Sequence, residues 1–310
     1  MLQREGYALD ANTWCELNRP DITEDEADVV IFGIPFDGGV SYRGGAAEAP
    51  DTLCANTLES SACTERLDFF ADLKVYDAGN FVGTRDEIFA DVETYVERLV
   101  RKGRRFTMVG GDHSCTIPVQ RGIDHAIDGQ LGIIHVDAHM DLCDEMHGDV
   151  LSHGSTERRA LELDHVTGPQ NIYFVGIRSI EPDEFVYMRK NPLQVKTAFD
   201  CFHEGMGKVT EDVITAMSAF EQVYLTLDID SLDPAYAGGT GTPQMGGLTA
   251  RMLLDFVNAL FGHLNILGFD VVEIAPRLDD SLASMYAGRK LITEGWGNWA
   301  RELGKLESAR

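Results

Sequence analysis

Acidic residues and a histidine alternate in a short motif, Asp137-Ala138-His139-Met140-Asp141, which directly follows the apolar run 131–136. If that run is a β-strand that continues into the motif, side chains two residues apart project to one face. Two carboxylates and an imidazole then converge where the strand ends. Such a set of oxygen and nitrogen donors is half of a metal site.

The same kinds of side chain follow three other apolar runs. Asp228 and Asp230 come after one run, His113 after a second and Glu273 after a third. In open parallel sheets, ligands bind outside the carboxyl ends of the strands. One such motif alone is more typical of a turn or a helix cap, but four equivalent placements in one chain point to a shared site.

The donor types predict the chemistry of that site. Four carboxylates buried together repel one another and raise their own pKa values, and two divalent cations offset that charge. Oxygen and imidazole donors without thiolate suit Mn²⁺, with Fe²⁺, Co²⁺, Ni²⁺ and Zn²⁺ as alternatives. Two such ions about 3.5–4 Å apart activate a shared water as a nucleophile at neutral pH. The pattern therefore predicts metal-assisted hydrolysis.

The elements that position these residues alternate along the chain. Short apolar runs predict strands, and amphipathic spacing predicts helices between them. Thr84, with Glu87 three residues on, is placed to cap the first long helix. The alternation predicts one α/β domain with a mainly parallel sheet over 29–310, after an N-terminal extension of residues 1–28. Strands are expected at 29–35, 73–76, 105–109, 131–136, 171–175, 194–197, 222–227 and 265–271, and helices at 85–102, 114–127, 155–163, 210–220, 249–261 and 281–303.

The overall charge excludes some partners. The 310 residues include 51 acidic and 26 basic side chains, which gives a net charge of −25. Such a field repels nucleic acid and anionic membranes and favours cationic ligands, although solubility alone explains most of it. Six scattered cysteines without CxxC spacing fit free thiols. With no apolar leader and no membrane-spanning run, a cytoplasmic protein is expected.

Taken together, these motifs resemble the signatures of the ureohydrolases, the arginase and agmatinase family. The resemblance runs from about residue 29 to residue 300 and implies a single three-layer α/β domain with an eight-stranded parallel sheet. It also implies a binuclear manganese site and homotrimers or homohexamers. The motifs that carry it are 111–114, 137–141, 227–234, 239–243, 246–247 and 270–273.

The same resemblance implies a role for each residue of the site. Asp137 and Asp228 would bridge two ions, one held also by His113 and Asp141 and the other by His139 and Asp230. His153 matches the family's acid/base histidine and Glu273 the carboxylate that receives the guanidinium, and Asp141 is counted with them as catalytic. Glu273 would fix the cation, and His153 would protonate the departing amine, an effect of about 10² to 10⁴ in rate.

The substrate predicted by this resemblance is agmatine, which is cleaved to urea and putrescine. Arginine is disfavoured because the segment 142–149 lacks the Asn-Thr-Pro-type stretch of arginine-specific members. The spacing from Asp141 to His153 resembles the agmatinase and guanidino-acid branch. Asp144, Glu145 and Asp149 favour a cationic tail.

The chain departs from the family pattern at several positions near the pocket. Met140 replaces a small residue, Thr156 and Glu157 replace a Pro-Phe-like pair, and Ala47 stands where an arginine is common. None of these changes removes a metal ligand. They leave a guanidino acid, 4-guanidinobutyrate or 3-guanidinopropionate, as an alternative substrate.

Three other functions compete with this interpretation. A two-metal phosphoesterase needs cations that hold phosphate, and the motifs have no basic cluster beside them. A single-zinc deacetylase binds only one ion, so His113 and Asp141, the additional ligands for a second ion, would have no role. An inactive metal-binding homologue would not need His153 and Glu273.

Other polar residues near the motifs are expected to have structural roles. We expect Asp112 and Asp233 to hold loops by hydrogen bonds rather than bind metal. His135 is predicted to be a packed histidine.

Overall fold

Eight parallel strands form the centre of the computed structural model, which describes residues 10–58 and 60–308. Their order is β3-β1-β4-β9-β8-β5-β6-β7, and every neighbouring pair is parallel. All eight predicted strands are present, and the predicted α/β fold is confirmed. The strands are β1 (Val29–Ile34), β3 (Val75–Asn80), β4 (Arg105–Gly110), β5 (Leu131–Val136), β6 (Ile172–Ile177), β7 (Gln194–Thr197), β8 (Gln222–Asp228) and β9 (Ile266–Val272).

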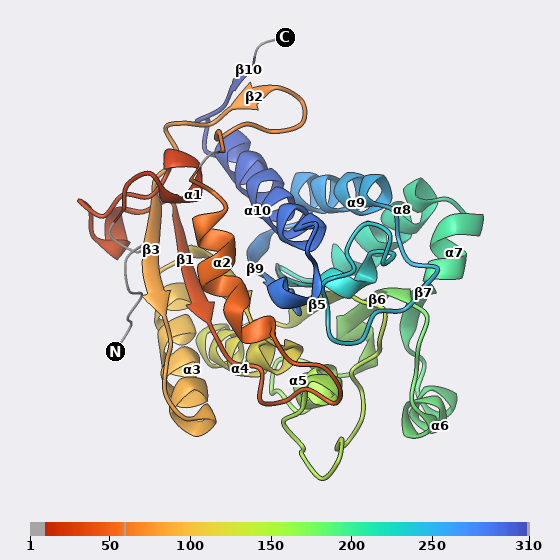
Figure 1. Cartoon of the computed structure of the whole chain (residues 1–310). Helices are drawn as coiled ribbons and strands as arrows, with labels where there is room; N and C mark the ends of the chain where they lie inside the picture. The colour runs from red at the N-terminus through yellow and green to blue at the C-terminus, as the bar shows by residue number, and fades with distance from the viewer. Residues whose placement is uncertain (1–9, 59, 309–310) are drawn as a thin grey trace.

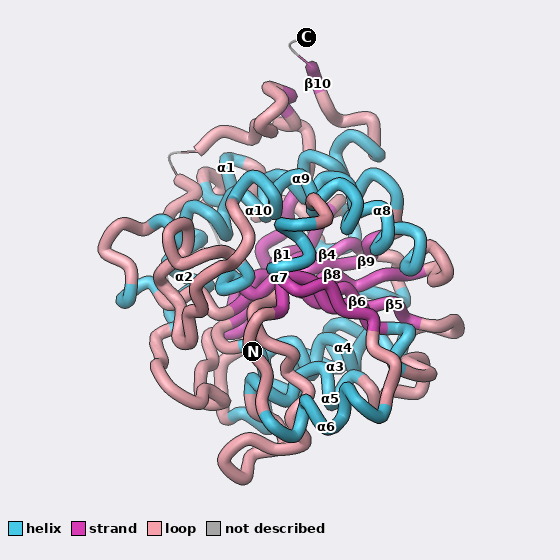
Figure 2. The backbone as a smooth tube through the Cα atoms, turned by 90° about the vertical axis from the view of Figure 1, so that its right-hand side faces the viewer, coloured by secondary structure: helices cyan, strands magenta, loops and turns pink. Residues whose placement is uncertain are grey.

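Helices cover both faces of the sheet and make a three-layer domain (Figures 1 and 2). One layer contains α3 (Arg85–Arg101), α4 (Thr116–Ala126), α5 (Thr156–Ala160) and α6 (Pro182–Lys190). The other contains α1 (Thr13–Glu16), α2 (Ala49–Ala55), α7 (Ala198–His203), α8 (Met206–Met217), α9 (Ala250–His263) and α10 (Ala283–Glu302). Because both faces are covered, the central strands are mostly apolar, and every residue of β1 and β5 is buried.

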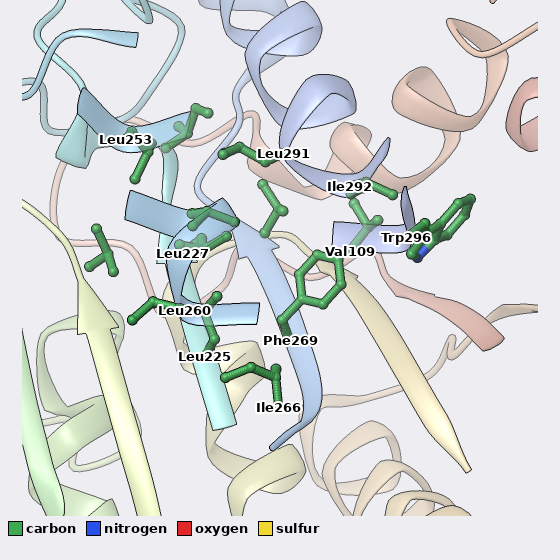
Figure 3. Packing of buried hydrophobic residues seen from close by; sticks show 14 of the residues in the cluster. Val109, Leu225, Leu227, Leu253, Leu260, Ile266, Phe269, Leu291, Ile292 and Trp296 are labelled. Carbon is green, nitrogen blue, oxygen red and sulfur yellow. The ribbon is translucent and has the colours of Figure 1, made fainter. Parts of the chain in front are cut away.

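The core between the sheet and α9 and α10 fixes the site-bearing strands (Figure 3). Phe269 of β9 packs on Trp299 of α10, with ring centroids 5.3 Å apart. Trp296 of α10 donates a hydrogen bond to Thr107 of β4 at 2.9 Å. Trp14, which precedes β1, packs edge-on against Trp296 at 5.8 Å. Residues ahead of residue 29 therefore share this core.

Several element boundaries differ from the sequence prediction. The helix expected from residue 210 begins at Met206, because Gly205 adopts a positive φ of 89° that ends the preceding turn. The helix expected over 155–163 is reduced to α5. The short helix α2 and a two-stranded sheet of β2 (Asp68–Phe69) and β10 (Glu307–Ser308) were not predicted. Two-residue strands are too short to show a periodic pattern.

The predicted cap of α3 is confirmed. The Thr84 hydroxyl accepts a hydrogen bond from the Glu87 backbone N–H at 3.4 Å, and the Glu87 carboxylate accepts one from the Thr84 N–H at 2.9 Å. This reciprocal pair satisfies two N–H groups at the helix start that have no partner within the helix.

Across residues 10–58 and 60–308, the structure has no helix both long enough and apolar enough to cross a membrane.

Candidate metal centre

Four neighbouring strands deliver the predicted site residues to one edge of the sheet. His113 follows β4, Glu273 follows β9, Asp228 ends β8 and Asp137 follows β5. In the sheet these strands are adjacent, in the order β4-β9-β8-β5. Their carboxyl ends therefore lie side by side, and motifs far apart in the sequence meet.

The first group of donors surrounds His113. Its Nδ1 lies 3.0 Å from Asp137 Oδ2, 3.1 Å from Asp141 Oδ2 and 3.4 Å from Asp228 Oδ2. All four side chains are buried. The structure thus brings together the four residues predicted for one ion.

The second group lies beside the first and shares Asp137 with it. His139 Nδ1 is 3.4 Å from Asp137 Oδ1 and 3.2 Å from Asp230 Oδ2. Ligand atoms of Asp137, His139 and Asp230 all lie within 4.8 Å of one another. His139 is the only one of these three that is partly exposed.

Local hydrogen bonds fix the carboxylates. The backbone N–H of His139 donates to Asp137 Oδ1 at 2.6 Å, and that of Asp230 donates to Asp228 Oδ1 at 2.7 Å. The backbone of Asp141 has a φ of 52° and that of Glu273 a φ of 63°. A non-glycine residue in this region carries strain of about 1–3 kcal/mol, and such strain clusters at functional sites.

The tautomer of His113 fits a metal ligand. The Thr226 hydroxyl donates its hydrogen to Asp270 Oδ1 at 2.7 Å, so it accepts from His113 Nε2 at 2.8 Å. Because Nε2 then carries the ring hydrogen, the Nδ1 lone pair points at the three carboxylates. The sequence analysis did not identify Thr226. Its position two residues before Asp228 on the same strand could have indicated that the two side chains project to the same face.

Unpaired buried atoms support the same fit. Within the described chain, His113 Nδ1, Asp137 Oδ2 and Asp230 Oδ2 make no hydrogen bond. Burial raises the pKa of Asp228 well above its usual range, and the charges of Asp230 and Asp137 add to the effect. A divalent cation would reverse that penalty, since it favours the ionised carboxylate. The donor set therefore suits two divalent cations.

His153 and Glu273 form a pair beside these groups. His153 Nδ1 lies 2.9 Å from Glu273 Oε1, which also accepts the His113 backbone N–H at 3.0 Å. On its other side, His153 Nε2 lies 2.9 Å from Ser41 Oγ and accepts the Ser41 N–H at 3.1 Å. Burial lowers the pKa of His153, but the contact with Glu273 outweighs it and raises the pKa to about 9.

A cavity of about 150 Å³ opens above the donors. Pockets for drug-sized ligands measure about 300–1,000 Å³, so this one suits a small substrate. Besides predicted site residues, its lining includes Ser41, Glu181, Glu184, Thr242 and Gln244, which sequence reasoning missed. Ser41 and Glu181 lie in loops that follow β1 and β6, so the rule that function gathers at strand ends could have found them.

A second cavity adjoins the first and shares Ser41, Met146 and Glu181 with it. It is lined in addition by Glu145 and Asp183, and by Cys143 and His147. Glu184 stands between the loops, where it accepts N–H groups of Leu142 at 2.8 Å and Glu181 at 2.7 Å. Burial raises the pKa of Glu184 to about 7.

Asp112 and Asp233 have the structural roles predicted for them. Asp112 accepts the Gly39 N–H at 2.7 Å, and Asp233 accepts the Gly246 N–H at 2.7 Å. The glycine after β4 is also needed, because a Cβ at Gly111 would lie 1.9 Å from the Phe36 carbonyl oxygen. These contacts hold the loops after β1, β4 and β8 around the donors.

His135 is a packed histidine, as predicted, and it also contacts the donor groups. Its ring is fully buried and stacks on that of His113 at 5.0 Å and 4°. Met140 is fully buried within the apolar core, outside the lining of both cavities.

Comparison with known proteins decides the family. Residues 27–296 match the model of the arginase family. The chain belongs to the arginase family. The predicted resemblance to arginases and agmatinases is confirmed by this match.

Named relatives of this chain include an agmatinase and a guanidinobutyrase. The chain is 34% identical to an agmatinase of Bacillus subtilis over 275 residues, which is 87% of this chain and 91% of that protein. It is 32% identical to a guanidinobutyrase of Pseudomonas aeruginosa over 277 residues, 87% of this chain and 86% of that protein. Proclavaminate amidinohydrolase from Streptomyces clavuligerus superposes with a TM-score of 0.84 and 29% identity, over 93% of this chain and 97% of that one.

Proposed function

We propose that this arginase-family protein hydrolyses a linear guanidino compound to urea and an amine, with agmatine as its substrate and putrescine as its product. Family membership supports the reaction class. The relatives named agmatinase and guanidinobutyrase both support a guanidino substrate, and they differ in the charge of the tail. The choice between them depends on the cavity.

The charge of the cavity walls carries the choice of agmatine. Besides the assigned metal ligands Asp141 and Asp228, the side chains of Glu181 and Glu184 line the first cavity. The adjoining cavity adds Glu145 and Asp183. Among the described residues that line either cavity, none is a lysine or arginine. A protonated amine at the end of the substrate is attracted by these carboxylates, whereas the carboxylate of a guanidino acid is repelled.

The donor groups would hold two Mn²⁺ ions. One ion is assigned to His113, Asp137, Asp141 and Asp228, and the other to His139, Asp137, Asp228 and Asp230. Oxygen and imidazole donors without thiolate support manganese, although Fe²⁺, Co²⁺, Ni²⁺ and Zn²⁺ accept the same donors. When bound, two such ions activate a water molecule for attack at neutral pH.

The protein's own side chains then orient the substrate and move a proton. Glu273 attracts the guanidinium and holds its carbon near the nucleophile. The attack is then effectively unimolecular and needs less loss of translational and rotational entropy. His153 gains its second proton at Nε2, because Nδ1 already donates to Glu273. Nε2 is therefore the atom that would deliver a proton to the amine as it leaves.

A substrate panel tests this proposal. Purified protein loaded with Mn²⁺ is assayed for urea with agmatine, 4-guanidinobutyrate, 3-guanidinopropionate and arginine. We expect urea from agmatine at the highest kcat/KM. Urea from a guanidino acid alone would overturn the choice of agmatine. No urea from any compound, with two ions bound per chain, would overturn the ureohydrolase function.

A homotrimer or homohexamer in the cytoplasm completes the proposal. Large apolar side chains on the surface, such as Phe199, Phe202 and Met245, are 67%, 73% and 85% exposed and support association. Cysteines in the described residues are free thiols, which supports a reducing compartment. Light scattering after size-exclusion chromatography gives the oligomer mass directly.

A further inference from the structure

A buried glutamate lies behind the donor groups, outside both cavities. Glu157 is the second residue of α5, and its side chain is fully buried. A carboxylate removed from water is costly unless its oxygens have partners. Within the described chain, Oε2 makes no hydrogen bond, so the partners of Oε1 account for the position of this side chain.

Those partners lead towards the site. Glu157 Oε1 accepts the Gln120 amide N–H at 3.1 Å and lies 3.1 Å from His135 Nδ1. On the other side of the imidazole, His135 Nε2 lies 3.2 Å from the His139 carbonyl oxygen and 3.2 Å from Asp137 Oδ2. One ring thus joins Glu157 to the backbone and the side chain of two assigned ligands.

The donor pattern shows why a carboxylate is present. His135 Nε2 faces only acceptors, a carbonyl and a carboxylate, so it must carry a hydrogen. A glutamate beside Nδ1 keeps the ring oriented with Nε2 towards Asp137. Nδ1 likewise faces a carboxylate oxygen, so each ring nitrogen is set to donate a hydrogen bond, one to Glu157 and one towards Asp137 and the His139 carbonyl. A glutamine has no charge and can turn its NH₂ group towards Nδ1, so it would hold the ring less firmly in this orientation.

The ring also supports the first donor group. It stacks on the His113 ring at 5.0 Å with an interplanar angle of 4°. Any tilt of His135 would therefore disturb His113 as well as the turn that carries Asp137 and His139. Partners of this kind are known to affect metal affinity by about 10- to 100-fold.

We propose that Glu157 is a positioning residue of the metal centre, which acts through His135 to hold Asp137 and the 137–139 turn in the geometry that binds both ions. This inference rests on the metal assignment made above. The alternative is that Glu157 only fills space between α4, α5 and β5.

Metal affinity separates the two roles. We expect Glu157→Gln, which keeps the shape of the side chain, to weaken Mn²⁺ binding about 10-fold or more, measured by calorimetric titration of the metal-free protein. Its unfolding temperature without metal should stay close to that of the unaltered protein. The matched control is Glu294→Gln, another buried glutamate, which pairs with Lys290 on α10 and should leave Mn²⁺ affinity unchanged.

A double substitution tests whether Glu157 acts through His135. If it does, Glu157→Gln should have no further effect on Mn²⁺ affinity in a His135→Gln background, because coupled residues are not additive. Additive losses would overturn the proposed route. Unchanged Mn²⁺ affinity in Glu157→Gln alone would overturn the positioning role.

The metal titration of the unaltered protein distinguishes this inference from its premise. If the unaltered protein binds two Mn²⁺ ions and Glu157→Gln binds them equally well, only the role of Glu157 fails. If the unaltered protein binds no Mn²⁺, the metal assignment itself fails, and the role of Glu157 fails with it.

Discussion

His153 and Glu273 contact each other beside the donor groups, with Nδ1 of the histidine 2.9 Å from Oε1 of the glutamate. Both side chains come from loops that follow different strands, and both are buried. The contact uses one carboxylate oxygen and one ring nitrogen. Oε2 of Glu273 is then the atom available for the cation, and Nε2 of His153, which contacts the Ser41 hydroxyl and N–H, is the atom assigned to the leaving group.

The raised pKa of His153 predicts how activity depends on pH. Glu273 stabilises the charged imidazole, so His153 stays protonated up to about pH 9. We expect kcat to fall as pH rises through that value, since the leaving amine then lacks its proton donor. Glu273→Gln should lower the pKa of His153 and move this fall to lower pH. A pH–kcat profile measures the shift, and Glu211→Gln on the exposed side of α8 is the control.

The same pair predicts a change in stability with pH. A histidine whose pKa is raised in the folded state contributes stability that is complete below its unfolded pKa of about 6.5 and is lost as pH rises through the folded pKa. We expect this contribution to disappear between pH about 6.5 and about 9. Thermal unfolding of His153→Asn across that range should show a smaller slope; an identical slope would contradict the assignment.

Removal of His139 should separate the two donor groups. Its Nδ1 contacts Asp137, which both groups share, and Asp230, which belongs to the second group alone. We expect His139→Ala to retain one ion per chain where the unaltered protein holds two, with urea release at background level. Plasma mass spectrometry of the dialysed proteins counts the ions. His263→Ala, an exposed histidine at the end of α9, should keep both.

Substrate selectivity should respond to Glu181. This carboxylate is exposed and lines both cavities. An exposed charge contributes about 0.2–1 kcal/mol, so Glu181→Gln should raise KM for agmatine by roughly 1.5- to 5-fold. The substitution should also lower the ratio of kcat/KM for agmatine to kcat/KM for 4-guanidinobutyrate. If KM for agmatine and KM for 4-guanidinobutyrate rise equally, Glu181 does not discriminate between substrates by the charge of their tails.

Core packing behind β9 should matter for stability. Phe269 is fully buried and packs on Phe261 and Trp299. Phe269→Ala should lower the free energy of unfolding by about 3–5 kcal/mol, because it removes buried apolar area and leaves a cavity. Phe185→Ala on the exposed side of α6 should change it by about 0.5 kcal/mol or less. Chemical unfolding followed by circular dichroism compares the two.

Local pattern was enough to predict the strands and the acidic and histidine side chains that the structure brings together at their ends. Apolar runs such as 131–136 marked the buried strands, and the ends of those runs located Asp137, His139 and Asp141. The strand alternation expected through 137–141 is wrong, because β5 ends at Val136 and Asp141 has a φ of 52°. The start of α8 was missed, because Gly205 and Gly207 obscure the helical pattern. Burial of Trp14 in the core was not predicted from residues 1–28, because its partner Trp296 lies at the far end of the chain.

The sequence by itself determined which residues carry oxygen and imidazole donors and that each follows a strand, because both properties depend on residues a few positions apart. Only the tertiary structure decided that β4, β9, β8 and β5 are neighbours and that Glu157 contacts His135. Strand order and side-chain contacts depend on packing between distant segments. The cluster of acidic and histidine side chains was therefore predictable, whereas the cavity walls and the contact between Glu157 and His135 were not.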